Sequence, residues 1–190
     1  NEVHCPPEVF APAFRFLRNF KSQEFAKESM FLPPVSPRLS ATYHVGEDFL
    51  DIASALRAID ETIEFLNYRR GDRLGHALGL GIAPEVHYAN KGRRIFMPKQ
   101  QRLDDLVWLL YRGRELGTHI DPHMYGLLKK EAEILLLELY GDVIRNNRWV
   151  ITLTEYHCCM QLRGDDPSLY RDAQFSRPGL GYGPYDQYLT

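Results

Sequence analysis

Two short runs of strand-type residues, each ending in a histidine, flank one amphipathic helix and constrain the fold of this chain more than any other feature. The first run is Leu39–His44 and the second is Asp72–His76. Between them, apolar residues recur at helical spacing: Phe49, Ile52, Leu56, Ile59, Ile63 and Leu66. Asp48 can cap this helix, which we expect to end near Asn67. A strand, a helix of about 20 residues and a second strand form the βαβ unit of a parallel sheet or of a (β/α)8 barrel.

The residues at the ends of these runs are the candidates for chemistry. His44, at the C-terminal end of a strand, can present a ring nitrogen to a metal ion in the mouth of a barrel. Gly46 allows a tight turn, so that Glu47 faces the same cavity, where a carboxylate can move the proton of a metal-activated water. His76 ends the next strand, and an imidazole there can orient the attacking water. Any single histidine is more often a core or loop residue, but two at consecutive strand ends favour a shared site.

The two runs and the helix between them resemble strands five and six of the adenosine deaminase family, a branch of the metal-dependent amidohydrolase superfamily. Thr42–Glu47 resembles the family's His-Ala-Gly-Glu segment, and Asp72–His76 resembles its Arg-(Ile/Leu)-Gly-His-Gly segment. Asn1-Glu2 and Pro7–Phe14 are similar to the sequence just after strand four. The long helical segment that follows resembles an insertion in the enlarged bacterial adenosine-deaminase-like proteins, which include an antiphage-defence deaminase.

The resemblance implies an α/β fold: a fragment of a (β/α)8 TIM-type barrel, covering about strands five and six with their flanking helices, followed by a mainly helical insertion. We expect the barrel segment at residues 1–95, the insertion at 96–163 and an irregular tail at 164–190. Apolar residues recur at helical spacing in three further segments: 9–17, 103–110 and 124–140. The apolar segment 149–162 fits either a helix or a strand.

The resemblance also implies the hydrolytic deamination of adenosine or an adenine nucleotide at a Zn²⁺ ion. His44 would be a zinc ligand, and Glu47 would be the proton shuttle that protonates the purine ring. His76 would stabilise the zinc-bound hydroxide as it attacks the carbon that loses ammonia. Two positions depart from the family: Ala77 stands where glycine is usual, which alters the turn, and Val45 replaces a small alanine. The choice between a nucleoside, a nucleotide and RNA as substrate stays open.

The sequence lacks the residues that supply the other zinc ligands in the family. No His-x-His pair occurs in it. Gly164–Pro167 mimics the Asp-Asp-Pro that carries the family's last ligand, at Asp165, but it follows a helical stretch and is more typical of a turn or a helix cap. His119–His123 is expected to form a turn before a helix, and Cys158-Cys159 lacks the Cys-x-x-Cys spacing of a zinc site. We therefore expect the zinc site to be incomplete in this chain.

The chain ends and the composition support further expectations about the length, binding partners and location of the protein. The chain opens at Asn1 without a methionine and closes on a segment rich in Gly, Pro and Tyr, so we expect a piece of a longer protein that is inactive alone. The net charge of −2 does not indicate a DNA-binding surface. The longest apolar run, Ile134–Leu139, is far below the ~20 residues of a membrane span. Three cysteines and no signal peptide predict a cytoplasmic protein.

Three functional hypotheses remain open. In the first, the chain is part of a zinc-dependent, adenosine-deaminase-like hydrolase that acts on a purine nucleoside or nucleotide. In the second, the same barrel hydrolyses a different substrate in an amidohydrolase-type reaction, because a fold does not fix a substrate. In the third, the chain is a non-catalytic fragment or an oligomerisation module. We also expect a homo-oligomer, because a partial barrel exposes strand edges and apolar helix faces.

Overall fold

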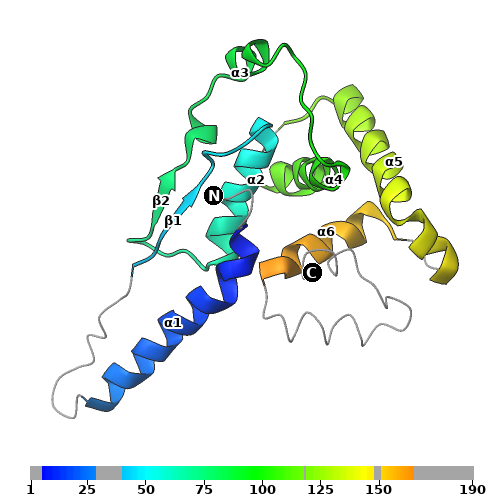
Figure 1. Cartoon of the computed structure of the whole chain (residues 1–190). Coiled ribbons are helices and arrows are strands. Elements are labelled where there is room, and N and C mark those ends of the chain that lie inside the picture. Colours follow the sequence, from blue (N-terminus) through cyan, green and yellow to red (C-terminus); the bar gives the residue numbers. More distant parts are fainter. Residues whose placement is uncertain (1–5, 29–39, 118, 148–150, 165–190) are drawn as a thin grey trace. The chain divides into compact units, whose positions relative to one another are not determined.

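The computed structural model describes most of the chain: residues 6–28, 40–117, 119–147 and 151–164. These residues are mostly helical, with one small parallel sheet. The chain divides into two compact units (Figure 1). The first unit comprises Asn1–Arg93 with Gly164–Asp166, and the second comprises Arg94–Arg163 with Pro167–Thr190. Within the described residues, no helix combines the length and the apolar character needed to cross a membrane.

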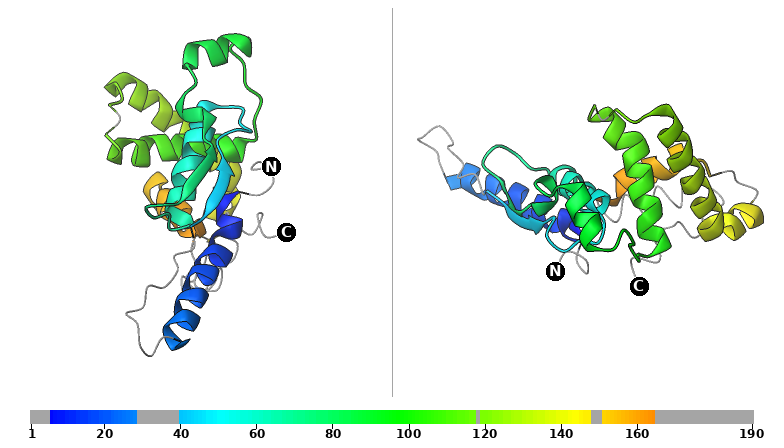
Figure 2. Two further views of the ribbon diagram at one scale, coloured as in Figure 1. Left: turned by 90° about the vertical axis from the view of Figure 1, so that its left-hand side faces the viewer. Right: turned by 90° about the horizontal axis from the view of Figure 1, so that it is seen from above.

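The first unit contains the predicted strand–helix–strand segment. β1 (Thr42–Val45) and β2 (Arg73–His76) are joined by α2 (Ile52–Phe65) and pair in parallel. The register places Val45 opposite His76, so both strands end at the same edge of the sheet. The two strands lie side by side in Figure 2, with α2 packed along them. The prediction of a parallel βαβ unit is therefore confirmed.

α2 begins later than predicted, because its N-terminal cap is Asp51. The backbone of Asp51 is extended (φ −113°, ψ 140°), and its Oδ1 accepts a hydrogen bond from the amide of Ala53 at 3.1 Å. The prediction that Asp48 caps the helix was wrong: both aspartates precede the apolar repeat, but only Asp51 adjoins the first helical residue. The helix ends at Phe65, short of the predicted Asn67, whose φ of +51° is not helical.

The buried face of α2 matches the predicted stripe only in part. Ile52 and Ile59 are buried as predicted, whereas Ile63 is 43% exposed. Thr62 is fully buried instead, and its hydroxyl donates a hydrogen bond to the carbonyl of Ala58 at 2.8 Å. Because this bond satisfies the hydroxyl within the helix, threonine can occupy a position that the apolar pattern assigned to isoleucine.

α1 (Pro7–Glu28) packs against α2 and includes the segment 9–17 that was predicted to be helical. Phe10 and Phe14 approach the ring of Tyr43 on β1, with centroids 6.0 Å and 6.1 Å away. Ala11 is fully buried in a cluster with the C-terminal end of α2. These contacts hold α1 against both the helix and the first strand of the βαβ unit.

Asp72 links α1 to the start of both strands. Its carboxylate accepts hydrogen bonds from the amides of Ala41 at 2.7 Å and Arg69 at 2.6 Å, and it pairs with the guanidinium of Arg18 at 2.8 Å. Burial by itself raises the pKa of the Asp72 carboxyl, but the two amide donors and Arg18 outweigh it and hold this pKa below its ordinary value of 3.8. The ionised carboxylate therefore stabilises the folded first unit.

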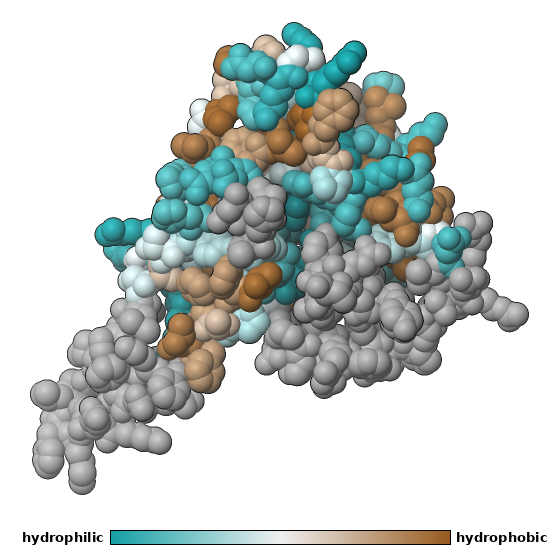
Figure 3. All heavy atoms as spheres, in the orientation of Figure 1, coloured by the Kyte–Doolittle hydropathy of each residue, from teal (hydrophilic) through white to brown (hydrophobic). Residues whose placement is uncertain are grey.

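After β2 the chain forms two short helices that the sequence did not predict. η1 (Leu78–Leu80) is a single 3-10 turn, and α3 (Pro84–Asn90) starts with proline at its first position. The sequence of α3 has no apolar stripe, and none of its residues is buried. Hydrophobic side chains lie among hydrophilic ones on the surface in Figure 3, and Leu78, Leu80 and Val86 are each more than half exposed.

The second unit is helical in its described residues. The elements that follow α3 are, in chain order, α4 (Lys99–Trp108), the π-helical turn η2 (Leu109–Gly113), α5 (Pro122–Asn147), α6 (Leu153–Gln161) and η3 (Leu162–Gly164). The predicted apolar repeat of α4 is buried, including Leu103 and Leu106. The ambiguous segment 149–162 is helical from α6 onward, where Thr152 and Glu155 form a capping box.

A buried carboxylate on α4 pairs with one residue of α6 and one residue of η3 within the second unit. Asp104 is 2% exposed and pairs with both terminal nitrogens of Arg163, at 2.8 Å and 2.7 Å. The hydroxyl of Tyr156 donates to the same carboxylate at 2.6 Å. Burial, together with the charge of Asp104, raises the pKa of Tyr140 to about 12. The carboxylate of Asp104 thus accepts hydrogen bonds from both terminal nitrogens of Arg163 and from the Tyr156 hydroxyl, which offsets the cost of burying its charge.

We expect Asp72→Asn to lower the free energy of unfolding by about 1–3 kcal/mol at neutral pH, because an amide cannot balance the charge of Arg18. The pKa of Asp72 is lowered on folding, so its contribution is present above the ordinary aspartate pKa and is lost as the pH falls through the lowered value. Urea denaturation at neutral and acidic pH measures both effects.

The exposed carboxylate of Glu133 provides the control, because Glu133→Gln should change stability little at any pH. A difference between the wild-type protein and Asp72→Asn that stays constant down to strongly acidic pH would contradict the role given to the ionised Asp72.

Candidate metal centre

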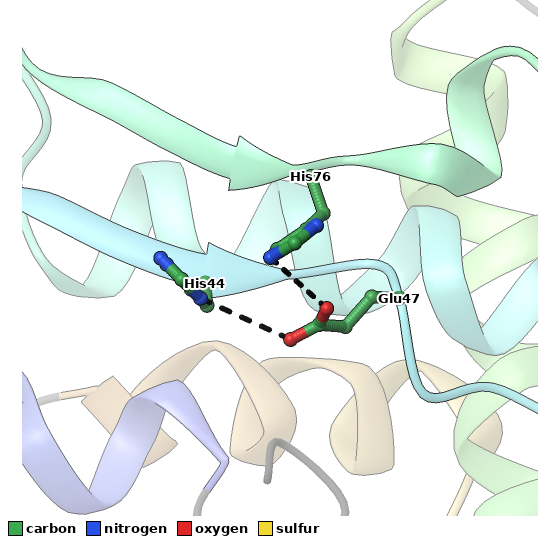
Figure 4. A group of neighbouring side chains, drawn as sticks. All are labelled: His44, Glu47 and His76. Atoms are coloured by element: carbon green, nitrogen blue, oxygen red, sulfur yellow. Dashed lines mark ion pairs between the residues drawn. The ribbon is translucent and has the colours of Figure 1, made fainter.

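The three predicted site residues lie together at the C-terminal ends of the two strands. His44 belongs to β1, His76 is the last residue of β2, and Glu47 lies in the loop after β1 (Figure 4). One carboxylate oxygen of Glu47 is 3.1 Å from His76 Nε2, and the other is 4.0 Å from His44 Nδ1. One ligand atom from each of the three residues lies within 4.8 Å of the other two. Within the described residues, this is the group whose geometry suits a shared metal ion.

The strand register and two glycines explain how these side chains meet. His44 pairs with Gly75 across the sheet, and a Cβ atom on Gly75 would lie 2.3 Å from Cδ2 of His44. Glycine therefore makes room for the imidazole, and the rings of His44 and His76 meet edge to face with centroids 4.7 Å apart. At the turn after β1, Gly46 has a φ of +74°, and a Cβ there would lie 2.8 Å from Cδ1 of Ile59.

The turn that follows β2 has a strained backbone. His76 and Ala77 are consecutive residues with φ values of +63° and +49°, a conformation that costs a non-glycine residue about 1–2 kcal/mol. The amide of Ala77 donates to the carbonyl of Val45 at 2.9 Å, and the amide of Gly79 donates to the carbonyl of Gly46 at 3.1 Å. These bonds hold the turn in place. Ala77 thus has the left-handed conformation that favours glycine, which is the residue expected there in the adenosine deaminase family.

The candidate centre is open to solvent. The side chains of His44, His76 and Glu47 are 64%, 42% and 29% exposed. Imidazole and carboxylate groups are the usual ligands of zinc in hydrolases, and two histidines with one carboxylate also hold Fe(II) in other enzymes. The group therefore offers up to three ligands and stays accessible to water and to a substrate.

The other candidate residues from the sequence lie elsewhere. Asp121 caps α5, where its Oδ2 accepts a hydrogen bond from the amide of His123 at 2.9 Å, so the predicted turn before a helix is confirmed. On α6, Cys158 is exposed and Cys159 is partly buried. Asp165, the candidate for a last zinc ligand, lies outside the described residues.

Two residues that the sequence analysis did not single out contact the loop that carries Glu47. His87 and Tyr88, on α3, form hydrogen bonds to Leu50 and Asp51, respectively. Each of these pairs is separated by 37 residues in the sequence. No local pattern marks such contacts, because they depend on where the chain places α3 after it leaves β2.

Comparison with known proteins gives no family for this chain: no protein-family model matches it, and a search of curated proteins finds no match. The candidate centre therefore rests on its own geometry. The likeness to adenosine deaminases, which depends on the segments Thr42–Glu47 and Asp72–His76, stays a prediction.

We expect Ala77→Gly to raise the free energy of unfolding by about 1 kcal/mol, because glycine adopts the positive φ of this position without strain. Ala89→Gly is the matched control: Ala89 lies in α3, and the same substitution inside a helix should lower stability by about 1 kcal/mol. Thermal or urea denaturation of the two variants measures both changes. The account of the turn fails if Ala77→Gly destabilises the protein as much as Ala89→Gly does.

Proposed function

We propose that this chain is part of a zinc-dependent hydrolase that resembles adenosine deaminase, with His44, Glu47 and His76 on one side of its active site. The observation that carries this proposal is the convergence of two imidazoles and one carboxylate at the ends of adjacent parallel strands. In parallel α/β folds, and in (β/α)8 barrels above all, active sites are built at that edge of the sheet. The backbone strain at His76 is also typical of functional sites.

The proposed parent fold is a (β/α)8 barrel in which β1 and β2 are neighbouring strands. In the described residues the sheet has two strands, so each has one edge to which another strand can add. The order of strand, helix and strand in β1, α2 and β2 is the order that repeats around a (β/α)8 barrel. The expected cytoplasmic location and homo-oligomeric state stay predictions.

The donor set fits zinc, because one ligand atom from each of two imidazoles and a carboxylate lies within 4.8 Å of the other two. We propose His44 as a zinc ligand. Bound zinc would lower the pKa of a coordinated water and so supply a nucleophile at neutral pH. Further ligands would come from residues outside the described ranges or from other parts of a longer protein. The described residues would contribute one ligand and two groups that act on protons.

Glu47 is the residue proposed to move protons. One of its carboxylate oxygens lies 3.1 Å from Nε2 of His76, within hydrogen-bonding distance. The side chain of Glu47 is 29% exposed, whereas the side chains of an ion pair in a protein core are buried. A carboxylate in this position can take a proton from the attacking water and deliver it to a ring nitrogen of the substrate. His76 keeps the carboxylate oriented by their ion pair and presents its imidazole to the same space.

The substrate proposed from the family resemblance is adenosine or an adenine nucleotide. In this reaction one water adds to the carbon that bears the exocyclic amine, and ammonia leaves, so that the amine is replaced by oxygen. Glu47 supplies the proton that the ring nitrogen takes up during the addition. A nucleoside, a nucleotide and RNA all present the same amine to the centre.

We expect the full-length protein that contains these residues to release ammonia from adenosine or an adenine nucleotide. Glu47→Ala should reduce the rate by about 10²- to 10⁴-fold, the range that a positioned proton-transfer group contributes. Glu85→Ala is the control, because Glu85 is an exposed carboxylate of the same unit and lies on α3. Full activity of Glu47→Ala would exclude the proposed role of Glu47.

An alternative function is the hydrolysis of another substrate at the same centre. The exposure of the three side chains favours this alternative, because the three side chains by themselves select for no particular substrate. A screen that finds no purine turnover, but finds hydrolysis of an amide or ester that is lost in Glu47→Ala, would support this alternative.

A further inference from the structure

Glu47 lies in a loop without regular secondary structure, between the end of β1 at Val45 and the cap of α2 at Asp51. A catalytic carboxylate has to be held within about 0.5 Å of its working position, which a loop achieves only through contacts from its surroundings. The residues that provide these contacts determine where Glu47 lies relative to His76.

The first end of the loop is held by the turn after β2. The amide of Ala77 donates to the carbonyl of Val45 at 2.9 Å, and the amide of Gly79 donates to the carbonyl of Gly46 at 3.1 Å. Because both donors lie within three residues of His76, the start of the Glu47 loop is tied to the same short segment that carries the second imidazole.

The second end of the loop is held by α3. Nε2 of His87 lies 3.0 Å from the carbonyl oxygen of Leu50, and since a carbonyl only accepts, this nitrogen carries the proton. The His87 ring also stacks on Phe49, with centroids 5.4 Å apart and an interplanar angle of 27°. The hydroxyl of Tyr88 donates to Oδ1 of Asp51 at 2.7 Å. Three consecutive loop residues are therefore held by two neighbouring residues of one helix.

The oxygen that Tyr88 contacts has a second role, because Oδ1 of Asp51 also accepts the amide of Ala53 and so caps α2. The end of the loop is thereby fixed to the first turn of α2 as well as to α3. His87 and Tyr88 are both partly buried, unlike Val86 next to them, which is 59% exposed. The two partly buried residues of α3 are thus the ones that contact the loop.

We propose that His87 and Tyr88 are positioning residues, which hold the loop so that the Glu47 carboxylate meets His76. This inference deepens the proposed function, and its effect on catalysis rests on that function. Its effect on the position of Glu47 relative to His76 can be measured without any activity. A purely structural role of α3 would affect stability without changing the Glu47–His76 ion pair.

The ¹⁵N resonance of His76 Nε2 provides the test, because its chemical shift reports the ion pair with Glu47. It is measured by long-range ¹H–¹⁵N NMR on the full chain, and its assignment is fixed by its loss in His76→Gln. The shift in Glu47→Gln defines the value without the ion pair. His87→Ala/Tyr88→Phe should move the resonance at least half of the way to that value, and Val86→Ala should leave it unchanged.

Two further variants separate positioning from folding. Tyr88→Phe removes one hydroxyl and should move the resonance in the same direction by a smaller amount, even if the double variant does not fold. His87→Gln keeps a side-chain N–H donor and should restore much of the wild-type shift. An unchanged His76 resonance in folded His87→Ala/Tyr88→Phe, or in Tyr88→Phe if the double variant is unfolded, overturns the proposal. An equal shift in Val86→Ala also overturns it.

The activity of the full-length protein gives the second readout. His87→Ala should lower kcat by about tenfold to a hundredfold, the cost of displacing a catalytic group by about 1 Å, and should leave KM nearly unchanged. If Glu47→Ala is fully active, the proposed function fails, but the NMR result still decides whether α3 positions the loop. If Glu47→Ala is inactive and His87→Ala retains the wild-type kcat, the positioning role fails alone.

Discussion

The candidate centre depends on the parallel pairing of β1 with β2. Two parallel strands joined by a helix end at the same edge of a sheet, and the register of Val45 with His76 makes them end side by side. His44 then lies opposite Gly75, the one residue type without a side chain to displace its ring. A slip of one residue in the pairing would remove Gly75 from its place opposite His44 and change the arrangement of the group.

The two ends of the strands have opposite roles in the energetics of the first unit. At their start, the buried carboxylate of Asp72 joins α1 and the two strand-leading segments with two amide hydrogen bonds and an ion pair. At their finish, His76 and Ala77 adopt a strained left-handed backbone. Strain of this kind persists only where the surrounding structure determines the conformation. The packing of α1 and α2 against the strands provides that surrounding structure.

The sequence predicts the βαβ unit and the three site residues because both depend on local patterns. Apolar residues at helical spacing identify α2, and the two histidines mark the strand ends. The sequence does not distinguish Asp48 from Asp51 as the cap, because both are good capping residues before an apolar repeat. It also assigns Ile63 to the core, although an internal hydrogen bond allows Thr62 to be buried instead.

The contacts of α3 show where prediction from a single sequence ends. This helix has no buried residue, and its sequence has no apolar periodicity from which it could be predicted. Its hydrogen bonds to the Glu47 loop join residues that are 37 positions apart in the sequence. The further ligands that the proposed zinc site requires present the same difficulty on a larger scale, because ligands from distant strands would share no local pattern with His44. The contacts of α3 and the positions of ligands from distant strands both depend on the tertiary structure.

The most direct measurement of the central claim is the nuclear Overhauser effect between the imidazole protons of His44 and His76. Their ring centroids are 4.7 Å apart, so the parallel register predicts a cross-peak between the two rings. The cross-peak should disappear in Gly75→Ala, in which the added Cβ displaces the ring of His44. Absence of the cross-peak in the wild-type chain, with both rings assigned, would contradict the register and with it the candidate centre.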